Sequence, residues 1–154
     1  MKVVLYIIVI LVIIYMSFFT YLSFMSLKAP RLGVLNGRLR PCPGTPNCVL
    51  SEEKGASTFI EPFAIRGDSQ QAWKIVKEVV KQGGGRIENA TDEYLWATFR
   101  TTLWHFVDDL ELRLDKKNNV IHVRSASRVG RGDMGMNRKR VEELRAVFGQ
   151  KLPK

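Results

Sequence analysis

Histidine and cysteine are scarce in this sequence, which contains two of each. His105 and His122 lie 17 residues apart with no cysteine near either of them, and two cysteines without a histidine cluster make a poor zinc site. We therefore expect no metal, no cofactor and no catalytic histidine. The length of 154 residues leaves room for one domain of ordinary size, which excludes a multidomain enzyme.

Charge is absent from the 23 residues between Val3 and Met25, a run rich in Ile, Val, Leu and Phe. A hydrocarbon core about 30 Å thick needs roughly 20 helical residues, so this run is long enough to cross a membrane. The segment Ser23 to Leu27 offers no convincing cleavage site and no cysteine for lipid attachment. We expect residues 1–27 to be an uncleaved, single-pass membrane anchor.

Two features disagree about the side of the membrane on which the rest of the chain lies. One basic residue precedes the apolar run and four follow it closely, which favours a cytoplasmic domain by the positive-inside rule. Cys42 and Cys48 form an isolated pair in a proline-rich loop, which is typical of an oxidising compartment. We expect a structural disulfide and a periplasmic domain on a bacterial inner membrane. The alternative is two free thiols on the cytoplasmic face.

The chain after the apolar run is basic, with 23 Lys and Arg once Lys2 is set aside against 15 Asp and Glu. Anionic lipid head groups next to an anchored domain account for such an excess without nucleic acid, which we do not expect as a partner. Proline and glycine interrupt residues 28–57, so this part is expected to be a tether and a cysteine loop.

Residues 58–154 have the hydrophobic periodicity of an α+β domain. Each helix has only one apolar stripe, which predicts an antiparallel sheet of about five strands with both helices on one face. In the strand over residues 106–115, leucines alternate with Asp109, Glu111 and Arg113, so we expect these charges to face outward. The expected order is strand 58–66, helix 70–82, strands 86–90, 93–102, 106–115 and 120–128, and helix 137–151 capped by Asn137.

The last strand begins apolar and then becomes polar on its inward face, at Ser125 and Ser127. If Leu112 lies opposite Val123, Asp108 faces Ser127; a shift of two residues would place Asp108 by Ser125 instead. Buried polar groups need partners, and we expect Arg128 or Arg131 to supply one for Asp108.

Two interpretations of this polar cluster remain open. It is either a structural network that holds the glycine-rich loop under the last helix, or an anion site formed by loop amides, the helix N-terminus and arginines. The glycine spacing matches no nucleotide-binding loop. The candidate ligand-binding residues are Asp108, Ser125, Ser127, Arg128, Arg131, Asp133, Asn137 and Arg138.

Two motifs carry a family resemblance. Around the cysteines the chain reads P-C-P-x-x-P-N-C-V, and from Arg124 it reads R-S-x-S-R-x-G-x-x-D-x-G-x-N-R-x-R-V. Together they resemble the bacterial and plastid family catalogued as domain of unknown function fourteen ninety-nine, over roughly Leu39 to Phe148. The family has no established activity that the resemblance could carry over to this chain. Relatives usually have two serines after the Cys-Val pair, whereas Leu50 precedes Ser51 here, which leaves no hydroxyl at position 50.

These observations favour a non-enzymatic, membrane-anchored domain that binds a partner protein or an anionic or lipidic ligand. A hydrolase would need a nucleophile with an adjacent base, and the spacing shows no such pair. The alternative is a small hydrolase-like enzyme that uses Asp108, Ser125, Ser127, Arg128 and Asp133.

Overall fold

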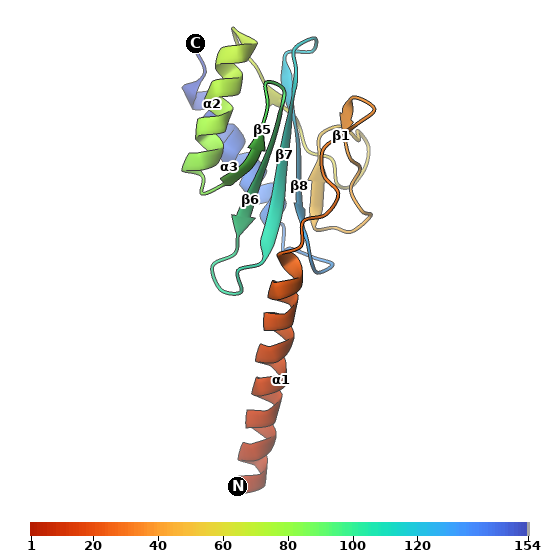
Figure 1. The fold of residues 1–154 in the computed structure, drawn as a ribbon, viewed down its shortest axis with the longest axis vertical. Helices are drawn as coiled ribbons and strands as arrows, with labels where there is room; N and C mark the ends of the chain where they lie inside the picture. Colours follow the sequence, from red (N-terminus) through yellow and green to blue (C-terminus); the bar gives the residue numbers. More distant parts are fainter. Residues whose placement is uncertain (154) are drawn as a thin grey trace.

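A computed structural model describes residues 1–153, in which one long helix projects from a small α+β domain (Figure 1). The helix, α1 (Lys2–Ser26), extends away from the domain, and its amino terminus lies at the far end. The remaining elements are β1 (Val34–Leu35), β2 (Arg38–Leu39), β3 (Cys48–Leu50), β4 (Phe63–Ala64), α2 (Ser69–Gln82), β5 (Arg86–Ala90), β6 (Tyr94–Arg100), β7 (Val107–Asp115), β8 (Val120–Ser127) and α3 (Met136–Lys151).

Six of the strands form one antiparallel sheet in the order β3-β8-β7-β6-β5, with β4 also paired to β8. β7 and β8 make the longest pairing, and in it Leu112 lies opposite Val123 and Asp108 opposite Ser127. The first of the two expected registers is therefore confirmed. The α+β class with an antiparallel sheet is confirmed as well.

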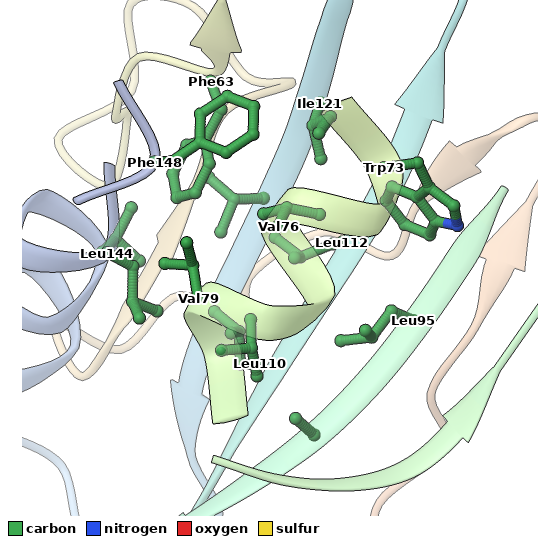
Figure 2. Packing of buried hydrophobic residues seen from close by; sticks show 14 of the residues in the cluster. Phe63, Trp73, Val76, Val79, Leu95, Leu110, Leu112, Ile121, Leu144 and Phe148 are labelled. Carbon is green, nitrogen blue, oxygen red and sulfur yellow. The ribbon is translucent and has the colours of Figure 1, made fainter. Parts of the chain in front are cut away.

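Both domain helices cover one face of this sheet, as their single apolar stripes require. Trp73, Val76 and Val79 of α2 pack against the leucines of β7, and Leu144 and Phe148 of α3 complete the core (Figure 2). The core is therefore a single layer of side chains between the sheet and two helices.

The ends of α2 follow from its sequence. The Asp68 side chain caps its first turn by accepting a hydrogen bond from the Gln71 amide at 2.7 Å. At the other end a Cβ on Gly85 would lie 2.7 Å from Val80 Cγ1 and 2.8 Å from Phe99 Cζ. Only glycine fits at position 85 without displacing core side chains, so the chain turns there directly into β5.

Two expectations about the start of the domain are wrong. The strand expected over residues 58–66 is reduced to Phe63–Ala64, because Pro62 has no backbone N–H to donate to a neighbouring strand. The stretch expected to be a tether and loop instead contains β3, which pairs with β8 through Cys48, Val49 and Leu50. Three apolar residues are too few to show a periodic pattern.

The charged face of β7 is buried, contrary to the expectation that it points outward. Asp109 is 1% exposed and Glu111 is fully buried. Residues 27–40, which we call the cover segment, lie over the sheet on the side away from α2 and α3 (Figure 1). The Gly33 amide within it donates to Glu111 Oε1 at 2.7 Å. The sheet therefore has an apolar face under the helices and a face of buried charges under the cover segment.

The expected disulfide is present, and it joins Cys42 to Cys48 with 5.8 Å between the two Cα atoms. We predict that the double variant Cys42→Ala/Cys48→Ala loses about 2 kcal/mol of unfolding free energy, because a crosslink across a short loop restricts the unfolded chain. Urea unfolding of the detergent-solubilised protein measures this loss. Reductant should lower the parent's unfolding midpoint and leave that of the double variant unchanged; a parent insensitive to reductant would contradict the prediction.

Candidate functional site

Asp108, at the start of β7, pairs with an arginine that the sequence did not single out. Its Oδ2 accepts a hydrogen bond from Arg140 Nη2 at 2.6 Å, and the side chains are 4% and 12% exposed. The Arg140 guanidinium also lies 4.6 Å from the ring centroid of Phe99. The expected pairing of Asp108 with Arg128 or Arg131 is wrong, because Arg140 projects from α3 onto the same face of the sheet.

Asn137, in the first turn of α3, is the centre of this cluster and is fully buried. The expectation that Asn137 caps the helix is wrong, because Gly135 occupies the N-cap position. The Asp133 carboxylate accepts from the amides of Gly135 at 3.0 Å and Asn137 at 2.8 Å instead. The Asn137 side chain contacts Ser125 Oγ, Ser127 Oγ, the Asn47 carbonyl, Asp133 Oδ2 and Arg140 Nη1, at 2.6 to 3.0 Å.

The structure thus brings together five of the eight candidate residues and leaves three apart. Arg128 lies on the opposite face of the sheet, where it pairs with Asp109. Arg138 donates to the carbonyls of Phe59 at 2.8 Å and Ser57 at 3.3 Å. Arg131 is exposed and has no hydrogen bond or ion pair to residues 1–153. The groups that were expected to hold an anion are therefore not aimed at one point.

Arg128 joins the sheet to the end of α1. It holds both carboxylate oxygens of Asp109, through Nε at 2.8 Å and Nη2 at 2.7 Å, and Trp96 Nε1 donates to the same carboxylate at 2.8 Å. The remaining nitrogen, Nη1, donates to the carbonyls of Ser26 at 3.1 Å and Leu27 at 3.0 Å. These carbonyls end the apolar helix and have no partner within it, so the guanidinium serves as its cap.

A second buried pair lies further along the same face. Arg124 Nη1 donates to Glu111 Oε2 at 2.9 Å, and the Tyr94 hydroxyl donates to Oε1 at 2.7 Å. Burial, followed by the charge of Glu111, raises the pKa of Tyr94. Tyr94 therefore stays protonated and continues to donate to Glu111, whose Oε1 also accepts from Gly33 of the cover segment.

An open hollow of about 570 Å³ lies at the far end of this face, and sequence reasoning missed it. Ser51 Oγ lies 3.1 Å from His122 Nδ1, and His122 Nε2 lies 3.6 Å from Asp115 Oδ2. Arg113 pairs with Glu52 at 2.5 Å beside them. The only signal was the outward position of His122 on its strand, because Ser51 and Glu52 come from a stretch without any periodic pattern.

The line of serine, histidine and aspartate in this hollow has the order of a hydrolytic triad, but its serine is already engaged. Ser51 Oγ accepts a hydrogen bond from the Val123 amide at 2.9 Å, and the residue is 3% exposed. Its own amide donates to the Val123 carbonyl, so Ser51 extends the pairing of β3 with β8. A nucleophile needs a free, approachable oxygen, and we assign Ser51 a structural role.

The chain matches a family model over residues 38–148, described as Protein of unknown function (DUF1499). The chain belongs to the DUF1499 family. No curated protein matches it. The DUF1499 match contains both motifs and the whole cluster around Asn137, whereas α1 and most of the cover segment precede it.

We predict that Arg140→Ala destabilises the DUF1499 domain by about 3 to 5 kcal/mol, because it leaves the buried Asp108 carboxylate without its cation. Urea or thermal unfolding measures this loss. Arg131→Ala is the matched control: it removes an exposed arginine and should change the unfolding free energy by less than about 0.5 kcal/mol. Equal stability of the two variants would show that the Asp108 pair contributes nothing.

The hollow predicts a pH dependence of stability. Burial lowers the pKa of His122 below its usual value of 6.5, so the unfolded chain takes up this proton more readily than the folded one. The unfolding free energy should therefore fall as the pH decreases below about 6.5, and His122→Gln should reduce that fall. His105→Asn, at the exposed histidine, is the control and should keep the parent's slope in urea unfolding at several pH values. A parent slope retained in His122→Gln would contradict the assignment.

Proposed function

We propose that this DUF1499 chain is a single-pass protein of a bacterial inner membrane whose periplasmic domain binds a partner protein or an anionic or lipidic ligand without catalysing a reaction. The observation that carries the proposal is the capping of α1 by Arg128. That contact ties the last turn of the apolar helix to the sheet of the domain. A detachable leader would need no such attachment.

The surface of α1 supports a place in a bilayer. Every side chain from Met1 to Phe18 is exposed, and almost all of these side chains are apolar. An apolar surface of that size is an aggregation liability in water and is stable in lipid. The helix contains 25 residues, enough for a hydrocarbon core about 30 Å thick.

The disulfide supports the periplasmic side. Bonds between cysteines persist in the bacterial periplasm and are rare in the reducing cytosol. Cys48 is buried and lies in a strand of the main sheet, so the crosslinked loop is part of the folded domain. The basic residues after α1 favour the opposite side, and the cytoplasmic face is the alternative that the experiment below tests.

The hydrogen bonds of the polar cluster favour binding over catalysis. The Ser125 hydroxyl donates to Asn137 Oδ1, and among residues 1–153 no imidazole contacts it. Asp108 is engaged by Arg140, and both serine hydroxyls of the cluster are engaged by Asn137. The hydrolase alternative therefore has no activated nucleophile in this cluster, whereas exposed cations such as Arg131 remain open to an anionic partner.

We predict that the chain stays in the membrane pellet at alkaline pH after carbonate washing. The double variant Ile10→Arg/Ile14→Arg should be released, because each central arginine raises the free energy of membrane insertion by about 2.5 to 3.5 kcal/mol.

The side of the membrane is tested by thiol labelling. Both cysteines are in the disulfide, so Lys117→Cys supplies a single free thiol in the β7–β8 turn. A membrane-impermeant maleimide should label it in spheroplasts. Labelling only after lysis would place the domain in the cytoplasm.

The binding function itself is tested by mass spectrometry of small molecules and lipids that copurify with the detergent-extracted chain. We expect an anionic compound or lipid that is retained by the parent and lost from a variant with the exposed arginines Arg131 and Arg100 replaced by glutamine. A copurified compound that the parent converts into a product would overturn the non-enzymatic assignment.

A further inference from the structure

The loop between β6 and β7, residues 101–106, packs against the apolar helix rather than against the domain. The Trp104 ring lies 4.9 Å from the Phe19 ring centroid and 6.0 Å from that of Tyr15. The Phe106 ring lies 6.2 Å from Phe19. Figure 1 shows this loop beyond the end of the sheet, next to the turns of α1 nearest the domain. The loop therefore occupies the same level as part of the apolar helix.

The length of α1 indicates the depth at which the β6–β7 loop lies relative to a bilayer. The 25 residues of α1 measure about 37 Å at 1.5 Å per residue, which exceeds a hydrocarbon core of about 30 Å by about 7 Å. Such an excess is close to the depth of one head-group layer. Phe19 lies seven residues before Ser26, about 10 Å along the axis. With the amino-terminal end of α1 at the far boundary of the hydrocarbon core, Trp104 comes to lie near the boundary between the acyl chains and the head groups.

The residues of the loop suit that boundary. Leu103, at its tip, is 77% exposed, although the loop is free to carry a polar residue there. Tryptophan is enriched at membrane interfaces, where its ring contacts acyl chains and its N–H stays in the polar layer. His105 has a φ of 54°, which turns the chain back toward β7 immediately after Trp104. The apolar pair Leu103 and Trp104 therefore forms the point of the loop.

A second loop leaves the domain at the same edge. The end of β8 lies opposite the start of β7, since Ser127 pairs with Asp108, so residues 128–135 begin beside α1 (Figure 1). Met134 in this loop is fully exposed, and Arg131 is exposed with it. Arg100, the last residue of β6, adds another exposed cation at this edge. Anionic head groups attract such arginines.

We propose that the β6–β7 loop is a second membrane contact, in which Leu103 and Trp104 enter the interfacial layer of the bilayer that α1 spans. Arg100 and Arg131 face its anionic head groups. The proposal rests on the membrane location proposed above. Because Arg128 fixes the end of α1 to the sheet, the two contacts hold the domain in one orientation with this edge on the membrane.

The test uses the full chain in liposomes of phosphatidylcholine with a minority of phosphatidylglycerol. Leu103→Cys supplies a single thiol at the loop tip, and Lys117→Cys supplies the matched control at the exposed turn between β7 and β8, at the other end of the sheet. Each is labelled with an environment-sensitive dye. We expect blue-shifted emission and several-fold stronger quenching by lipids with brominated acyl chains for the Leu103→Cys label than for the Lys117→Cys label.

Carbonate washing of the same liposomes separates the two proposals. Weak, equal quenching of both labels in a chain that resists carbonate would overturn the loop contact and leave the membrane anchor standing. Release of the chain by carbonate would overturn the anchor itself. A second copy covering the loop would appear as a Leu103→Cys disulfide dimer without lipid quenching, and this result would also overturn the loop contact.

Discussion

The buried pair of Arg128 and Asp109 is the contact on which the relation between the apolar helix and the domain depends. All three guanidinium nitrogens of Arg128 donate hydrogen bonds: two donate to the Asp109 carboxylate and the third donates to the last carbonyls of α1. A cation at a helix C-terminus is favourable, and here the same cation is neutralised from behind by Asp109. The Val107 amide, which donates to Ser26 Oγ at 3.2 Å, and the ring contacts of Phe19 with Trp104 and Phe106 add to this attachment.

Two consecutive aspartates divide this end of the sheet between two helices. Successive side chains of a strand point to opposite faces, so Asp108 faces α3 while Asp109 faces the end of α1. Each is held by one arginine, Arg140 on the first face and Arg128 on the second. Both arginines belong to the second DUF1499 motif, as does Asn137. These arginines of the motif are therefore explained by the buried ion pairs that they make with Asp108 and Asp109, and ligand binding is not needed to account for them.

The sequence was sufficient for features that depend on local periodicity and insufficient for those that depend on distant segments. The β7–β8 register and α2 follow from alternation, helical spacing and capping by Asp68, all within a few residues. The burial of Glu111 depends on the cover segment, which has no periodic pattern and meets β7 across 78 residues. Arg140 was missed for a related reason: its reach onto Asp108 depends on the angle at which α3 crosses the sheet.

The attachment of α1 to one edge of the sheet also separates two regions of the domain that could bind different partners. β7 starts at the edge beside α1 and its nine residues extend about 27 Å to Asp115, at 3.4 Å per residue. In the proposed orientation the hollow around His122 and Asp115 is therefore well above the membrane, beyond the reach of lipid head groups. Arg100 and Arg131 lie at the opposite edge. On the proposed membrane location, we expect an anionic lipid at the lower edge and a soluble partner at the hollow, so substitutions at one end should leave binding at the other intact.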